Sequence, residues 1–184
     1  LSASVISNGA TLAMALIDEK VLTASSPTVS FQNIPQNFRN LFVMCIVRTD
    51  RAAEQDGLLL RFNGDSGNNY DYQYLRANNA TITGSATIAT SSINIAVCEG
   101  ANARANNFSP VQVTIPVYSL ATNEKWAIAG LSAAFGNVSA VADVIMDVRS
   151  GRRRSAEAIS SITFIPEVGA NIVSGSVFTL YGLL

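Results

Sequence analysis

The chain has no histidine and few charged residues, which narrows the chemistry open to its 184 residues. Without histidine, Ser-His-Asp and Cys-His catalysis, His-ligated metal sites and histidine pH switches are excluded. Only 14% of residues are charged, against roughly 25% in a typical soluble domain. The 12 basic and 13 acidic residues give a formal net charge of −1. Since nucleic-acid binders usually carry a basic excess, no nucleic-acid partner is expected.

Cysteine is also scarce, and long apolar runs are missing. Cys45 and Cys98 each sit in a short apolar run, which favours buried free thiols over a disulfide between them and indicates a reducing compartment. No apolar run approaches the roughly 20 residues that span a bilayer. The apolar stretch 11–17 has no preceding Lys or Arg, so it does not resemble a signal peptide. The sequence therefore predicts no membrane partner.

What the chain has instead is apolar content, with 48% hydrophobic residues. Free monomers usually stay soluble through charged surfaces, and oligomer interfaces are more apolar than other surfaces. The composition therefore favours a subunit of an assembly, most simply a homo-oligomer. The alternative is a monomer whose surface is rich in Ser, Thr, Asn and Gln.

Apolar and polar residues alternate in much of the chain, which is typical of half-buried strands. Residues 111–117 alternate in this way, and Pro116 predicts that the strand ends there or lies at an edge. Residues 57–75 predict a hairpin whose turn is the Gly- and Asn-rich segment 63–69. The oxygens of residues 63–71 offer a calcium site as the alternative, although their spacing does not fit an EF-hand.

Further strands are expected at intervals of 10–15 residues or so. Residues 41–48 are apolar on both faces and predict a central, buried strand. Gly130 marks a bulge in a strand over Lys125–Phe135, residues 77–95 predict a long loop or a weak strand pair, and residues 50–56 one helical turn. The remaining strands are expected at 141–148, 159–165 and 176–181. This pattern predicts an all-β fold, an antiparallel β-sandwich that is jelly-roll-like.

Three groups of residues are candidates for function. The basic cluster Arg149, Arg152, Arg153 and Arg154 can pair with carboxylates, so it is either an assembly contact or a solvated turn. The alternating tyrosines Tyr70, Tyr72 and Tyr74 are either core residues or a glycan-binding stripe. The carboxylates in 50–56 favour local ion pairs over acid–base catalysis. No phosphate-binding, dinucleotide or CxxC motif is present, so no catalytic residue, cofactor or metal is assigned.

Several segments together resemble a known family. They are 31–41 (FQNIPQNFRNL), 48–53 (RTDRAA), 60–70 (LRFNGDSGNNY), 162–164 (ITF) and 175–182 (GSVFTLYG). This set resembles small virion structural proteins of tailed bacteriophages, over most of residues 28–182. The best block is 61–74. The resemblance implies a jelly-roll-like sandwich without enzymatic activity, and it carries over no catalytic residue.

The resemblance also implies a role and partners. The first expectation is a capsid decoration or cement protein, made in the host cytoplasm and located in the virion, that binds other copies of itself and the major capsid protein. A trimer is one candidate oligomer. Residues 1–27 are expected to form an arm or an added strand on a single sandwich domain, residues 28–184. The alternatives are a tail, fibre or knob component that adheres to a host glycan, and a virion hydrolase that uses Asp and Glu alone.

Overall fold

The computed structural model describes residues 14–135 and 144–184, and every regular element in these ranges is a β-strand. The fold is an antiparallel β-sandwich, as the sequence predicts, and a jelly-roll-like arrangement is consistent with it. The twelve strands of the described residues are β1 Met14–Val21, β2 Val29–Phe31, β3 Asn40–Val47, β4 Gln55–Phe62, β5 Tyr70–Asn78, β6 Thr81–Thr90, β7 Ile93–Glu99, β8 Ser109–Ile115, β9 Lys125–Phe135, β10 Val144–Arg153, β11 Ile162–Pro166 and β12 Val177–Leu183.

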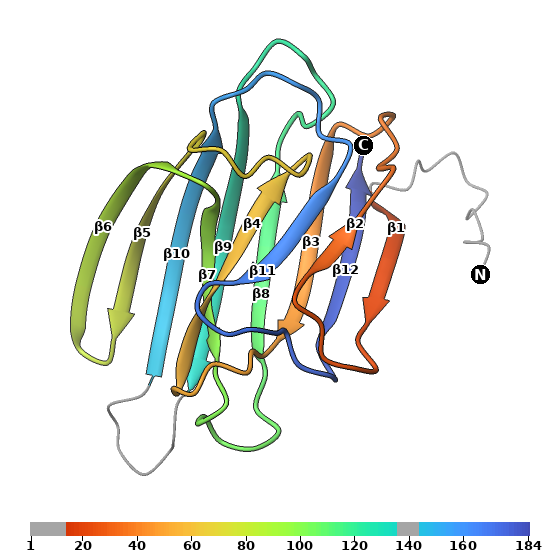
Figure 1. Cartoon of the computed structure of the whole chain (residues 1–184). Helices are drawn as coiled ribbons and strands as arrows, with labels where there is room; N and C mark the ends of the chain where they lie inside the picture. The colour runs from red at the N-terminus through yellow and green to blue at the C-terminus, as the bar shows by residue number, and fades with distance from the viewer. Residues whose placement is uncertain (1–13, 136–143) are drawn as a thin grey trace, which may run out of the picture.

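The two sheets differ in width. The large sheet has the order β1-β12-β3-β8-β9-β10-β5-β6, and the small sheet has the order β2-β11-β4-β7. Figure 1 shows the small sheet in front of the central strands, while β5 and β6 extend beyond it at the left. The large sheet therefore has an inner face that packs on the small sheet and an outer face that nothing in the described chain covers.

The core lies between the sheets and is built by alternate side chains of facing strands. Phe164 of β11 packs against Phe178 of β12, with ring centroids 5.0 Å apart and ring planes tilted by 44°, and it also meets Phe31 of β2 edge-on. All seven residues of β7 are buried, because this strand packs over β9 and β10. Cys45 and Cys98 are buried and free, which confirms the prediction made for them.

The predicted hairpin over residues 57–75 is wrong. β4 pairs with β7 and β11 in the small sheet, whereas β5 pairs with β10 and β6 in the large sheet. The segment between them crosses from one sheet to the other. The buried hydroxyl of Tyr70 accepts a hydrogen bond from the Phe62 backbone N–H at 3.0 Å and lies 3.1 Å from the Asp65 carbonyl oxygen. This side chain thus joins the end of one sheet to the start of the other.

Other local predictions have mixed outcomes. The strand over Lys125–Phe135 is confirmed, and the registers with β8 and β10 both shift at Gly130, so the bulge is confirmed. β8 ends before Pro116, as predicted, although it is a central strand. Residues 77–95 contain the β5–β6 turn, β6 and the start of β7. In place of the expected helical turn over 50–56, residues 52–54 form bends and residues 55 and 56 begin β4. The expected strand at 141–148 begins at Val144, and its first three residues lie outside the described chain.

β3 corrects the expectation of a strand buried on both faces. It is central, between β12 and β8, but only its inner side chains are buried, and Met44 and Ile46 on its other face are exposed. At the N-terminal end, β1 is the outermost strand of the large sheet and pairs with β12 of the same chain. Of the segment 1–27, residues 14–21 thus form this edge strand, and residues 1–13 lie outside the described range.

Candidate functional site

Three of the four arginines of the cluster lie on strand β10 instead of in a turn, and Arg154 directly follows the strand. β10 continues to Arg153 and pairs with β5 and β9 over this whole stretch, so the expected turn is wrong. Successive side chains of a strand point to opposite faces. Arg149 and Arg153 point inward and are buried, whereas Arg152 and Arg154 keep part of their side chains in solvent. Burial removes Arg149 and Arg153 from any surface that another subunit could reach.

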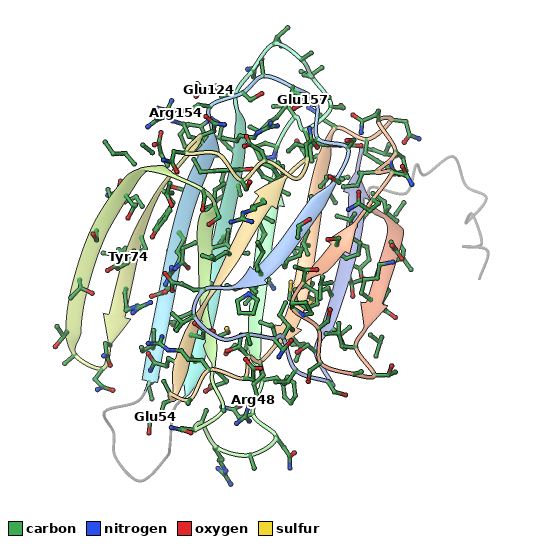
Figure 2. The ribbon with its side chains drawn as sticks, viewed as in Figure 1. Arg48, Glu54, Tyr74, Glu124, Arg154 and Glu157 are labelled. Atoms are coloured by element: carbon green, nitrogen blue, oxygen red, sulfur yellow. The ribbon has the colours of Figure 1, made fainter. Side chains whose placement is uncertain are left out.

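The arginines at the end of β10 are paired with carboxylates of the same chain. The Nε atom of Arg153 lies 2.8 Å from Oδ2 of Asp65, and its Nη1 atom lies 3.0 Å from Oε2 of Glu157. On the other face, Arg152 pairs with Asp71 at 2.9 Å and with Glu124 at 2.7 Å, and Arg154 also pairs with Asp71. Figure 2 shows Arg154, Glu124 and Glu157 at the same end of the molecule. Because the arginine charges are compensated within the chain, carboxylates of another protein would bind only weakly to these arginines.

Asp71 is the centre of the outer part of this ion-pair network. The hydrogen bonds from Arg154, with those from the Ala89 backbone and Arg152, lower the pKa of Asp71 to about 2. An unfolded chain has an aspartate pKa near 3.9. A carboxyl group whose pKa is lower in the folded state than in the unfolded state stabilises the fold. This stability is fully present at pH values above the unfolded-state pKa and is lost as the pH falls through the folded-state pKa.

We therefore expect Asp71→Asn to destabilise the protein at pH 7 and to differ less from wild type as the pH falls from about 5 to about 2. Urea denaturation of both proteins across this range measures the difference. The comparison with wild type is necessary because Asp50 and Glu157 also have lowered pKa values, through hydrogen bonds from Asn171 and Asn63 respectively, and contribute their own acid sensitivity. A stability difference that is independent of pH would contradict this assignment.

The three tyrosines of β5 have different environments. Tyr70 is fully buried in the core, so the glycan-binding interpretation is wrong for this residue. Tyr72 and Tyr74 are partly buried. The Tyr74 ring has the guanidinium carbon of Arg149 at 5.1 Å and that of Arg76 at 5.3 Å from its centroid, within cation–π distance. Figure 2 labels Tyr74 on the part of the large sheet that the small sheet leaves uncovered.

Both arginines that contact Tyr74 converge on one buried carboxylate, Asp147. The Arg76 guanidinium donates two hydrogen bonds to it, at 2.8 and 3.0 Å, and Arg149 donates from Nε at 2.8 Å. Arg149 also donates to the side-chain oxygen of Asn94 on β7. These hydrogen bonds hold the two guanidinium groups in place against the Tyr74 ring. The ring therefore contributes to the structure of the sheet and does not present a free surface on which a sugar could stack.

The polar residues around 48–56 have structural roles. Arg48 donates to four backbone carbonyls of the loop that follows β7, those of Ala101, Ala103, Arg104 and Asn107. Asp56 accepts from the hydroxyl of Thr49 and from two backbone N–H groups of the loop after β11. Arg51 lies 3.8 Å from Asp56, so the predicted local ion pairing is confirmed for this pair. These contacts organise one end of the sandwich, shown by Arg48 and Glu54 in Figure 2.

The Gly-rich segment 63–69 is organised by Asp65. Its carboxylate accepts hydrogen bonds from the Gly67 backbone, the Asn69 side chain and Arg153. Within residues 14–135 and 144–184, no group of three or more Cys, Asp or Glu side chains is placed to hold a metal ion. In the same ranges, no helix is long and apolar enough to cross a membrane.

The outer face of the large sheet carries most of the exposed apolar surface. Of the sixteen large apolar side chains that are exposed in the described residues, thirteen lie on this face, and the other three are in loops or at the C-terminus. The thirteen, which we call the outer apolar face, are Met14, Leu16, Val21, Met44, Ile46, Leu75, Ile82, Ile88, Trp126, Ile128, Val144, Met146 and Val148. Single exposed apolar residues are common on monomeric proteins, whereas thirteen large ones on one face of a sheet are unusual.

A groove of about 250 Å³ crosses one end of this face, between β9 and β6. Trp126 and Ile88 lie at its two sides, and Gln73, Ser150 and Arg152 contribute polar groups between them. Trp126 is not among the candidate site residues predicted from the sequence. The signal was present, since the bulky Trp126 and Ile128 alternate with small alanines, and the alanines are the residues that face the core.

Comparisons with known proteins add little to this geometry. No protein-family model matches the chain, and no curated protein matches it in sequence. Among solved structures, the galectin LEC-6 of Caenorhabditis elegans aligns with 96% of this chain and 99% of its own, at 9% identity and a TM-score of 0.30. A toad ovary galectin, solved with thio-digalactose, covers 76% of this chain and 98% of its own, at 12% identity and a TM-score of 0.26.

The carbohydrate recognition domain of Emp47p covers 93% of this chain and 86% of its own, at 11% identity and a TM-score of 0.31. All three similarities are too low to support an inference about what this chain binds.

Proposed function

We propose that this chain is a non-enzymatic structural subunit of a tailed-bacteriophage virion that decorates and stabilises the assembled head. The observation that carries the proposal is the outer apolar face. Thirteen half-exposed side chains of this size present on the order of 1,000 Å² in total on one face, and exposed apolar patches larger than a few hundred Å² mark protein–protein contacts. A standard protein–protein interface buries about 800 Å² per partner, so the face is large enough for one stable contact.

The low charge of the chain supports the same proposal. With 14% charged residues, a free monomer would depend on few charges to stay soluble. Because the arginines of β10 are already paired with Asp65, Asp71, Glu124 and Glu157, apolar contacts to other copies and to the major capsid protein carry the assembly. A protein that binds only the assembled shell stabilises that shell by mass action.

Charged substitutions on the outer apolar face test this role. We expect Met146→Lys and Val148→Lys to weaken self-association and binding to undecorated phage heads at least about tenfold, because an unpaired ammonium would be buried at the contact. Leu120→Lys and Val168→Lys are matched controls, since these side chains are equally exposed but lie in loops away from the face. Light scattering gives the mass of each protein, and co-sedimentation with heads gives its affinity and stoichiometry.

Each outcome of this experiment has a distinct meaning. A wild-type protein that forms a discrete oligomer and saturates the heads, while the two face variants do not, supports decoration. A monomeric wild-type protein that ignores the heads would contradict the proposal. So would face variants that bind as tightly as the loop controls.

The second candidate function is adhesion of a tail, fibre or knob component to a host-surface glycan. The groove beside Trp126 favours it, because an exposed aromatic ring beside uncommitted polar side chains is the arrangement that a sugar requires. The tyrosines first considered for this role lie on the same strand as Gln73, but Tyr72 and Tyr74 face the opposite side of the sheet.

A further inference from the structure

The groove on the outer face is built by two neighbouring rows of cross-strand residues. In the first row, Trp126 of β9 lies opposite Arg152 of β10, which lies opposite Asp71 of β5. In the second row, Ser150 of β10 lies opposite Gln73 of β5. Residues directly opposite each other in an antiparallel sheet share a face. The register therefore places an indole ring, a guanidinium, a hydroxyl and an amide side by side.

The walls of the groove are held in place. Asp71 accepts hydrogen bonds from Arg152 at 2.9 Å and from the Ala89 backbone of β6 at 3.0 Å, and it also pairs with Arg154. These contacts tie β10, β5 and β6 together at the level of the groove. A site on rigid strands loses less conformational entropy on binding than a site on loops. The groove is thus preformed in the free protein.

The floor of the groove offers polar groups that are not otherwise engaged. In the described part of the chain, neither the Gln73 amide nor the Ser150 hydroxyl has a hydrogen-bond partner, and Gln73 is exposed. An amide provides both a donor and an acceptor, and a hydroxyl does the same. This pair suits a ligand that carries neighbouring hydroxyl groups, each of which donates and accepts.

The charge and size of the groove narrow the class of ligand. Arg152 and Arg154 are compensated by Asp71 and Glu124, so the site does not favour a phosphate or another anion. Its volume of about 250 Å³ is below the roughly 300–1,000 Å³ of pockets for drug-sized ligands. Trp126, with 44% of its surface exposed, presents a flat apolar ring on which the C–H face of a pyranose can stack.

We infer that this groove binds one or two neutral sugar rings of a saccharide, with Trp126 as the stacking surface and Gln73 and Ser150 as hydrogen-bonding partners of the sugar hydroxyls. This inference supplies the site for the second candidate function and does not depend on head decoration. Arg152 and Asp71 position the walls, and Ile88 closes the side opposite the indole ring.

The chain contains a single tryptophan, so the fluorescence of Trp126 reports occupancy of the groove directly. The experiment titrates the full chain with the methyl glycosides of glucose, galactose, mannose, rhamnose and N-acetylglucosamine. We expect a saturable change in Trp126 emission with at least one of them. Gln73→Ala should weaken that binding about 3- to 10-fold, the effect of one neutral hydrogen bond.

Gln112→Ala is the matched control, because Gln112 is an exposed glutamine on the same outer face, on β8 and outside the groove. It should bind the glycoside as wild type does. Trp126→Ala, whose fluorescence is lost, is tested by retention on a resin that carries the same glycoside, and it should pass through unretained. Both glutamines and Trp126 are exposed, so these variants retain the core packing.

Two results would overturn the inference. In the first, no glycoside changes the emission of wild-type Trp126. In the second, Gln73→Ala and Gln112→Ala bind equally well. If glycosides fail to bind but Trp126→Ala abolishes binding to phage heads, the groove is a protein contact, and the saccharide site is wrong while head decoration stands. If a glycoside binds and the protein does not bind to phage heads, the saccharide site is supported and head decoration is wrong.

Discussion

Replacing Asp147 with alanine is expected to lower the free energy of unfolding by about 3–5 kcal/mol. Its carboxylate is fully buried and accepts hydrogen bonds from both Arg76 and Arg149. Only 3% of the Arg149 side chain is exposed, so the substitution leaves a buried guanidinium with Asn94 as its remaining side-chain hydrogen-bond partner. Urea denaturation of wild type and variant at pH 7 measures the loss as a shift of the midpoint.

Asp18→Ala is the matched control for this prediction. Asp18 pairs with Lys20 at 2.8 Å, but both side chains are about 40% exposed on the edge strand β1. Exposed ion pairs contribute about 0–1 kcal/mol, so the control should be close to wild type. Equal losses in the two variants would refute the importance of the buried network. Replacing Asp147 with leucine and Arg149 with methionine together should recover part of the stability, because the fully buried guanidinium is then removed with its carboxylate, and Arg76, which also loses Asp147, is 27% exposed and can be solvated.

Phe164→Ala is the second substitution with a large expected effect, a loss of about 3–5 kcal/mol. Phe164 of the small sheet is fully buried and packs against Phe178 of the large sheet. Its removal leaves a cavity where the two sheets meet, and the T-shaped contact with Phe31 is also lost. The same urea titration measures this change.

Phe42→Ala provides the comparison, because it removes the same ring from the outer face. Phe42 is only partly buried, and its ring contact is with Tyr181, 6.3 Å away on the neighbouring strand. We expect a loss well below that of Phe164→Ala, since no enclosed cavity forms. A loss as large as that of Phe164→Ala would mean that the outer face contributes to stability as the core does.

The local pattern of the sequence predicts strands well because alternation is a property of neighbouring residues. Lys125–Phe135 and its bulge at Gly130 were predictable for this reason. The partner of a strand depends on residues far away in the sequence. β4 and β5 are consecutive and separated by a turn-like segment, yet they belong to different sheets. The hydrogen bond from the Phe62 backbone to the Tyr70 hydroxyl joins the two strands, and the alternation of apolar and polar residues does not predict it.

The candidate site was harder to predict than the fold. Arg149, Arg152, Arg153 and Arg154 are conspicuous as a basic run. Asp147 and Glu157 are near them in the sequence, but their other carboxylate partners, Asp65, Asp71 and Glu124, lie 28 to 88 residues away, so most of their neutralisation was not visible. β3 shows the other difficulty. A strand that is apolar on both faces indicates burial on both sides in a parallel sheet, whereas here one face remains open and forms part of the outer apolar face.

The two free cysteines have a consequence for the dynamics of the sandwich. Cys45 lies on β3 of the large sheet and Cys98 on β7 of the small sheet, and burial raises the pKa of both thiols well above the usual value. Neither thiol can react with an alkylating reagent until its own layer opens. The relative rates at which the two thiols are alkylated therefore report the order in which the two sheets open. Equal rates mean that the layers open together in one cooperative event, and faster labelling of Cys98 means that the small sheet lifts away first.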